Sequence, residues 1–222
     1  MKNLSLTEEY AICILNEKES RSVLCYNEYA VCILATSIWE LISYKAIKLT
    51  KDRNLEVNVN FDGTKGYLKY IYDDIVSRKS IKVNELVEDY IFNGSNNNLK
   101  NVVNNLVEDL TKRQCIKIEK KEGLFKEKII YIGNEKVINN VITKIREDIL
   151  EGKDISAETM ILATMIFWSK AHKDYFSKYD AKQIKEKVKE IKETEEYLFI
   201  KEILDDIHSI LLTIVVSSSN MA

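Results

Sequence analysis

Proline is absent from all 222 residues of the chain, and glycine occurs only six times. Both residues interrupt helices, because proline lacks a backbone N–H donor and glycine loses more conformational freedom on folding than any other residue. Their scarcity favours long helices joined by polar turns and argues against a flexible linker between domains. Since 45% of the residues are apolar, the chain can bury a sizeable core. We therefore expect a mainly α fold, a single-domain helical bundle over residues 1–222.

Apolar periodicity predicts where the secondary structure lies. Ser5 and Glu8 have the spacing of a capping box, so a helix should begin there. Ser80 is expected to cap another helix. Two segments in which apolar and polar residues alternate predict small β-hairpins over residues 46–59 and 115–132. The expected helices cover residues 5–16, 26–44, 67–77, 80–91, 98–113, 135–150, 156–168, 180–196 and 197–216.

The sequence contains no pattern that is typical of a catalytic or metal site. The two histidines, His172 and His208, are far apart, and no common metal-ligand spacing occurs. Adjacent acids occur at residues 8–9, 73–74 and 205–206. Neighbours on a helix point about 100° apart, so these pairs do not converge on one substrate. We expect no enzymatic activity, no metal and no cofactor.

The cysteines and the apolar runs indicate a cytoplasmic location. Cys13, Cys25, Cys32 and Cys115 form no C-x-x-C pair and are interpreted as buried reduced thiols. No basic-then-apolar signal peptide opens the chain. The longest apolar run near the end, residues 210–216, is far shorter than the roughly 20 residues that a spanning helix needs.

The segment from Lys112 to Lys128 is the most distinctive part of the sequence. It contains seven basic and three acidic side chains, although the whole chain has a net charge of −2. The apolar pair Leu124-Phe125 lies at the expected hairpin tip. Basic flanks around an apolar tip suit an anionic bilayer surface, where each cation can contribute about 1 kcal/mol. The alternative is a charged surface hairpin whose Leu124 and Phe125 fold back onto the core.

A helix followed by a basic hairpin is also typical of a winged-helix DNA-binding unit. The helix at residues 98–110 would then be the recognition helix. It carries Glu108 and Asp109 but one cation, Lys100, whereas phosphate contacts need more lysine and arginine. We therefore do not expect nucleic acid as a partner.

Five segments occur in the order in which a known family has its motifs. They are LSLTEE at 4–9 for L-x-L-x-E-E, IWELISYKAI at 38–47 for I-E-L-A-L-R-G-R-I, LKNVVNNLVEDL at 99–110 for L-R-x-V-R-x-x-L-x-x-x-L, Leu124-Phe125 for an L-F hairpin tip, and TMILA at 159–163 for T-L-A-L-L. In this order they resemble the Golgi phosphoprotein 3-like family over nearly the whole chain. The short N-terminus looks more like the family's prokaryotic branch.

The resemblance implies a mostly helical single domain with one or two small β-hairpins. It also implies peripheral membrane association through phosphatidylinositol 4-phosphate, and adaptor work in eukaryotic members. The four head-group positions of the family fall here on Cys25, Leu34, Lys100 and Val103. Only Lys100 is positively charged, and lysine lacks the two-point grip of arginine on phosphate.

We therefore expect a peripheral membrane-binding or adaptor protein on the inner membrane face. Lys100, Lys112, Arg113 and Lys117 are the expected ligands of anionic phospholipid head groups, and Leu124 and Phe125 are expected to contact the membrane. The expected partners are an anionic phospholipid membrane surface, protein clients and a second copy of the chain bound through the hairpin. The first alternative is a cytoplasmic protein-interaction module without lipid binding. The second, less favoured alternative is the winged-helix DNA binder.

Overall fold

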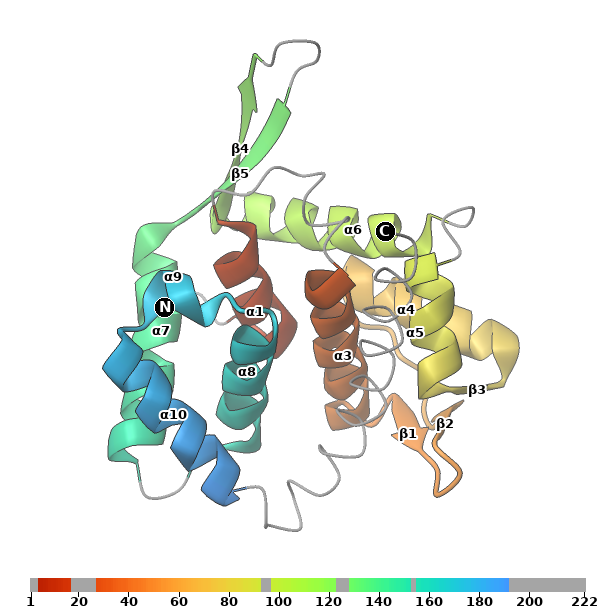
Figure 1. Ribbon diagram of the computed structural model, residues 1–222. Coiled ribbons are helices and arrows are strands. Elements are labelled where there is room, and N and C mark those ends of the chain that lie inside the picture. The colour runs from red at the N-terminus through yellow and green to blue at the C-terminus, as the bar shows by residue number, and fades with distance from the viewer. Residues whose placement is uncertain (1–3, 17–26, 93–96, 123–127, 153–154, 192–222) are drawn as a thin grey trace, which may run out of the picture. The chain divides into compact units, whose positions relative to one another are not determined.

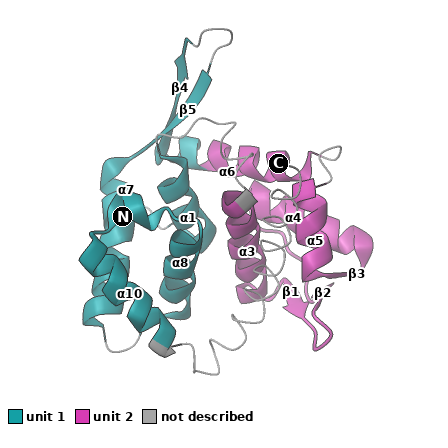
Figure 2. Cartoon of the chain, in the orientation of Figure 1, with its two compact units in different colours: residues 1–23, 110–202 teal, residues 24–109, 203–222 magenta. Residues whose placement is uncertain are grey.

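The structure, a computed structural model, describes residues 4–16, 27–92, 97–122, 128–152 and 155–191. Its described part is mainly α with two small antiparallel sheets, as the sequence predicted (Figure 1). The chain forms two compact units (Figure 2). Unit 1 comprises residues 1–23 and 110–202, and unit 2 comprises residues 24–109 and 203–222. The single-domain organisation expected for residues 1–222 stays a prediction.

Unit 2 is built around the helix α3 (Asn27–Ser43). This helix packs against α4 (Gly66–Arg78), α5 (Val83–Phe92) and strand β1 (Ile47–Leu49). Its residues 30–38 are buried without interruption, so it lies at the centre of unit 2. The one acid in its second half, Glu40, is 4% exposed and accepts a hydrogen bond from the Tyr67 hydroxyl at 3.2 Å. A buried carboxylate with such a donor is less costly than an unpaired one.

The small sheet of unit 2 has one strand more than expected. β1 pairs with β2 (Asn54–Val57) as predicted, and β2 also pairs with β3 (Ser80–Lys82), giving the antiparallel order β1-β2-β3. The prediction that Ser80 caps a helix was wrong: Ser80 opens a strand, and α5 begins three residues later. Ile81 is 6% exposed and lies opposite Leu55 in the sheet, so burial of this side chain favours the strand.

Unit 1 surrounds two buried helices, α1 (Leu6–Leu15) and α8 (Ala157–Trp168), which pack against each other. Residues 159–166 of α8 are all buried, as expected for a helix that is apolar nearly all round. α7 (Glu135–Arg146) contacts both helices. The short α9 (His172–Tyr175) is joined to α1 by a hydrogen bond from the Tyr175 hydroxyl to the backbone oxygen of Cys13 (2.5 Å). A π-helical turn at Glu147–Glu151 directly follows α7, and α10 (Lys178–Ile191) packs against this turn.

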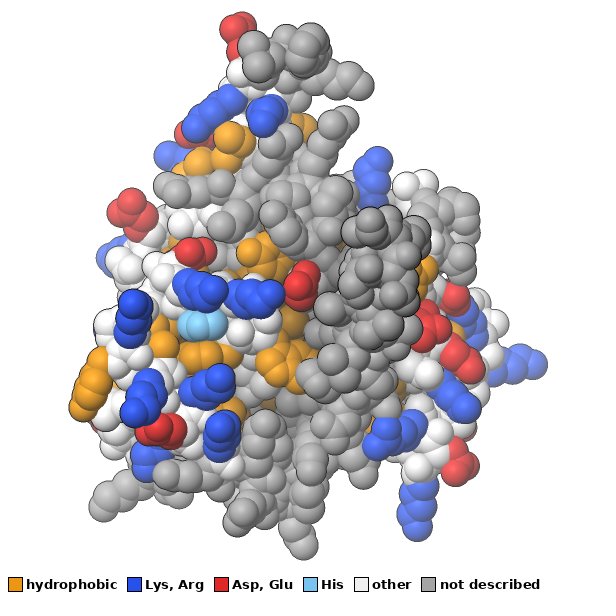
Figure 3. Space-filling model, in the orientation of Figure 1, with side chains coloured by type: hydrophobic (Ala, Val, Ile, Leu, Met, Phe, Trp, Pro, Cys, Tyr) orange, Lys and Arg blue, Asp and Glu red, His pale blue; other side chains and the backbone are white. Residues whose placement is uncertain are grey.

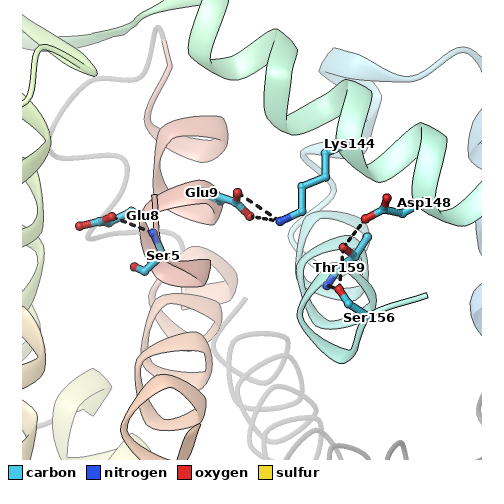
Figure 4. Close-up of polar contacts among 7 residues, drawn as sticks. All are labelled: Ser5, Glu8, Glu9, Lys144, Asp148, Ser156 and Thr159. Carbon is cyan, nitrogen blue, oxygen red and sulfur yellow. Dashed lines mark hydrogen bonds and ion pairs between the residues drawn. The ribbon is translucent and has the colours of Figure 1, made fainter. Parts of the chain in front are cut away.

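Side-chain caps fix where the helices of unit 1 begin. The Glu8 carboxylate accepts from the Ser5 backbone N–H at 2.8 Å, as the capping-box prediction requires (Figure 4). The Ser156 hydroxyl accepts from the Thr159 N–H at 3.1 Å and so caps α8. The Thr159 hydroxyl in turn donates to Asp148 at 2.7 Å, which joins α8 to the π-helical turn (Figure 4).

One helix has residues in both units. α6 (Asn98–Lys112) continues from unit 2 into unit 1 at residue 110. The helix predicted for residues 197–216 lies outside the described residues. Among the helices that the structure describes, none combines the length and the apolar character needed to cross a bilayer.

Candidate functional site

The predicted basic hairpin is present as β4 (Ile116–Lys121) and β5 (Lys128–Gly133). The strands pair from Ile116 opposite Gly133 to Lys121 opposite Lys128. The base of the hairpin is anchored in unit 1, because the Gly133 N–H donates to the Asn16 side chain at 3.0 Å and β5 contacts α1. Away from this base, the two strands extend beyond the helices of unit 1 (Figure 1).

The two faces of the hairpin carry different side chains, because directly opposed residues of an antiparallel pair share a face. One face has Ile118 and Ile129, which are 47% and 39% exposed, beside Lys120 and Tyr131. We call it the isoleucine face. The opposite face carries Lys117, Lys121 and Lys128 together with Glu119, and we call it the lysine face. All four of these charged side chains are exposed. The half-buried Ile130 and Ile132 share the lysine face.

Three of the four predicted head-group ligands lie at the hairpin base or on the hairpin. Lys112 is the exposed last residue of α6, and Lys117 is exposed on β4. The guanidinium of Arg113 lies 2.7 Å from the carboxylate of Glu8, which is 1% exposed. Lys100 lies in the first turn of α6, within unit 2, and is exposed. The tip residues Leu124 and Phe125 lie outside the described residues.

The family's head-group positions are mostly unavailable for ligand binding here. Leu34 and Val103 are 1% and 2% exposed and belong to the core of unit 2. Cys25 lies outside the described residues. Lys100 is thus the one exposed cation among these positions in the described part of the chain.

A pocket of about 800 Å³ opens between α8, α9 and α10 of unit 1. Its apolar wall comes from the C-terminal half of α8, from Phe176 directly after α9, and from α10. Five lysines line it as well, and none of its described lining residues is acidic. The space-filling view shows basic side chains gathered around hydrophobic ones on this face (Figure 3). The apolar lining residues are Ala163, Phe167, Trp168, Phe176, Ala181 and Val188, and the lysines are Lys173, Lys178, Lys182, Lys185 and Lys189.

His172 forms part of this pocket. Its ring stacks on Phe167 with centroids 4.4 Å apart and planes 3° from parallel. Within the described part of the chain its Nδ1 is buried and has no hydrogen-bond partner. Burial lowers the pKa of His172, interaction with the backbone of Ile166 and Phe167 opposes this shift, and the ammonium groups of Lys173 and Lys185 add to it. The imidazole is therefore neutral near pH 7.

The pocket between α8, α9 and α10 was not predicted from the sequence, although the spacing of its lysines was visible there. Lys178, Lys182, Lys185 and Lys189 follow each other at intervals of four, three and four residues, which places them on one side of a helix. Like charges at this spacing destabilise an isolated helix. Only a helix over residues 180–196 was predicted from the sequence, and no binding role was assigned to it.

Metal or thiol chemistry finds no support in the described residues. No group of three His, Cys, Asp or Glu side chains among them could hold a metal ion. Cys13, Cys32 and Cys115 are buried free thiols. Burial, with a smaller contribution from the charge of Glu9, raises the pKa of Cys13 far above its ordinary value. This thiol is therefore a poor nucleophile.

No known protein-family model matches the chain, and no curated protein matches it. The likeness to the Golgi phosphoprotein 3-like family therefore rests on the five ordered motifs. The β4–β5 hairpin and the pocket between α8, α9 and α10 are the two candidate binding surfaces among the described residues.

Proposed function

We propose that this protein attaches peripherally to membranes that contain anionic phospholipid, through the β4–β5 hairpin, and that it acts there as an adaptor without catalysis. The observation that carries the proposal is the pair of unlike faces on one exposed hairpin. The lysine face presents Lys117, Lys121 and Lys128, and the isoleucine face presents Ile118 and Ile129.

The physical basis is the electrostatic attraction between lysine side chains and anionic lipid head groups, supplemented by contact of the exposed isoleucines with the bilayer interface. Each lysine near an anionic bilayer contributes about 1 kcal/mol, and exposed isoleucines gain free energy in the interface. Glu119 and Glu122 oppose this attraction, so the net effect of the strands is modest. Because the whole chain carries a net charge of −2, attachment depends on which face meets the membrane. Exposed charges are screened over about 10 Å at 0.1 M salt, so binding should weaken as salt rises.

The proposed ligand is anionic lipid in general, with no single head group preferred. Two of the family's head-group positions are buried apolar residues, and Lys100 alone provides exposed positive charge among those described. Arg113 is paired with a buried acid and is only partly exposed, whereas Lys112 and Lys117 are exposed, which favours these two predicted ligands for contact with a membrane.

Vesicle sedimentation of the full-length protein tests the proposal. We expect binding to phosphatidylcholine vesicles that contain phosphatidylserine, weaker binding at high salt, and little binding to phosphatidylcholine alone. Vesicles with phosphatidylinositol 4-phosphate at the same surface charge should bind about equally well. The triple variant Lys117→Gln, Lys121→Gln, Lys128→Gln should lose most of this binding.

The control variant changes charge by the same amount at three exposed lysines elsewhere: Lys51→Gln, Lys82→Gln, Lys136→Gln. It should bind like the wild type. Equal losses in the two triple variants, or equal binding of wild type to neutral vesicles, would contradict the proposal.

A second candidate, protein interaction through the hairpin, is favoured by one observation. In the described part of the chain β4 and β5 pair only with each other, so each strand has an outer edge without a strand partner. Exposed edges pair readily with strands of other chains. Concentration-dependent self-association that Ile118→Ser and Ile129→Ser abolish, without any binding to vesicles, would favour this candidate over membrane attachment.

A further inference from the structure

The pocket between α8, α9 and α10 is separate from the hairpin and has a chemistry of its own. We infer that it binds a small anionic amphiphile: a molecule with an apolar chain and a carboxylate or phosphate head. Its volume of about 800 Å³ lies within the range of ordinary small-molecule sites. The inference does not depend on the proposed membrane attachment, because the two sites share no residue.

The charge of the pocket indicates an anion. The chain has 33 basic and 35 acidic side chains, so an average surface of this protein mixes the two signs evenly. The described lining of the pocket instead combines five lysines with no acid. Lys173 comes from α9, and the other four come from one side of α10. Lys182 also lies 3.9 Å from the Glu186 carboxylate, which is outside the lining. The net positive charge of the lining still attracts a ligand of the opposite sign and raises its local concentration.

The apolar wall indicates a chain and not a planar ring system. Phe167 already stacks on His172, and its centroid lies 6.2 Å from that of Phe176. The faces by which these three rings meet one another are therefore not open to a base. The Thr164 hydroxyl donates to the backbone oxygen of Met160 at 2.8 Å, so it is satisfied within its own helix. The rest of the apolar wall, which includes Trp168, Ala181 and Val188, suits a flexible hydrocarbon chain.

Competition with a fluorescent fatty acid tests the inference on the full-length protein. The probe is dansyl-labelled undecanoic acid, used below its micelle-forming concentration. We expect saturable binding, with displacement by dodecanoate and by dodecyl phosphate. Dodecanol, which has the same chain but no charge, should displace the probe poorly, and inorganic phosphate, which has charge but no chain, should not displace it. Adenosine monophosphate represents a planar aromatic anion and should also fail.

Two variants separate the head-group contacts from the chain contacts. Lys178→Gln, Lys185→Gln, Lys189→Gln should weaken binding of dodecanoate about tenfold, while the control triple at Lys51, Lys82 and Lys136 leaves it unchanged. Ala181→Leu should reduce the length of chain that binds best, which is read from a series of shorter fatty acids. Circular dichroism and thermal unfolding verify that each variant is folded.

Four results would overturn the inference: no probe binding by folded wild type, equal displacement by dodecanol and dodecanoate, displacement by adenosine monophosphate or phosphate as effective as that by dodecanoate, or equal weakening by both lysine triples. The hairpin triple variant should keep full binding of the soluble amphiphile. The pocket triple should keep its binding to anionic vesicles, so failure at one site is distinguishable from failure at the other.

Discussion

The guanidinium of Arg113 lies 2.7 Å from the carboxylate of Glu8, and the Glu8 side chain is only 1% exposed. The pair joins the end of α6 to the first turn of α1. Glu8 also accepts from the Ser5 N–H, so one buried carboxylate caps a helix and holds an arginine at the same time. Arg113 is therefore a stabilising residue of unit 1 before it is a ligand of anything outside the protein.

Replacing Arg113 should lower stability more than it lowers membrane binding. Arg113→Gln leaves Glu8 buried beside an uncharged side chain, and removing one partner of a buried pair costs up to 3–5 kcal/mol. Since Arg113 is 31% exposed, we expect a smaller loss of about 1–2 kcal/mol in the free energy of unfolding. Urea denaturation followed by circular dichroism measures it. Lys117→Gln, on an exposed strand, should change the midpoint little. A variant that unfolds like wild type but no longer binds anionic vesicles would assign Arg113 to the membrane.

The N-cap of α7 provides a second stability prediction. The Asn134 side chain accepts from the backbone N–H groups of Lys136 and Val137 at 3.1 and 3.4 Å. Asn134→Ala removes both hydrogen bonds and should cost about 1 kcal/mol. The matched control is Asn140→Ala, an exposed position in the middle of the same helix. There the same substitution should be neutral or slightly stabilising, because alanine has the higher helix propensity. Equal effects at both positions in urea denaturation would show that the cap is unimportant.

The thiol of Cys13 should be protected from modification in the folded protein. Burial raises its pKa, so the reactive thiolate is scarce, and reagents cannot reach the side chain. We expect Cys13, Cys32 and Cys115 to react with iodoacetamide at least about a hundredfold more slowly in native buffer than in urea. Mass spectrometry of peptides after timed labelling measures each site separately. Native labelling of Cys13 at the denatured rate would mean that α1 opens readily.

The lowered pKa of His172 predicts a loss of stability in mild acid. Burial is the main cause, Lys173 and Lys185 add to it, and interaction with the backbone of Ile166 and Phe167 opposes it without reversing the direction. In the unfolded chain the imidazole gains a proton near pH 6.5, before the folded protein does. Protonation then favours the unfolded state, so the contribution is fully present above about pH 6.5 and is lost as pH falls toward the lower folded value.

His172→Gln should therefore make the free energy of unfolding less dependent on pH between about 7.5 and 5 than it is in wild type. Urea denaturation at a series of pH values gives this slope. His208 is unchanged in the variant and serves as an internal constant. A slope in the variant that is as steep as that of wild type would mean that His172 is as easily protonated in the folded protein as in the unfolded chain.

Much of the fold could be predicted from local pattern, and the exceptions depend on contacts that are distant in sequence. The capping box at Ser5, the buried α8 and both hairpins follow from periodicity and composition. β3 was missed because Ser80 looks like a helix cap, and only its pairing with β2 makes the segment a strand. The π-helical turn after α7 was not predictable from periodicity either, since five residues are too few to define a period.

The candidate site likewise has some features that local sequence predicts and others that depend on contacts between distant residues. Exposure of Lys112 and Lys117 follows from charge alone. The pairing of Arg113 with Glu8 does not, because the two residues lie in different segments of the chain that come together only in the folded unit 1. The lysine spacing in α10 was visible in the sequence, but the apolar wall opposite it comes from α8 and could only be seen once the helices were packed.

Six described residues have a positive φ, and none of them is a glycine: Lys45, Arg53, Lys79, Asn97, Gln114 and Lys170. The three lysines follow the ends of α3, α4 and α8, where glycine, which has no Cβ, adopts a positive φ without steric crowding. Each such residue costs about 1 kcal/mol relative to an unstrained turn. A glycine at Lys79 or Lys170 would relieve that cost, so the molecule is less stable than its own architecture permits.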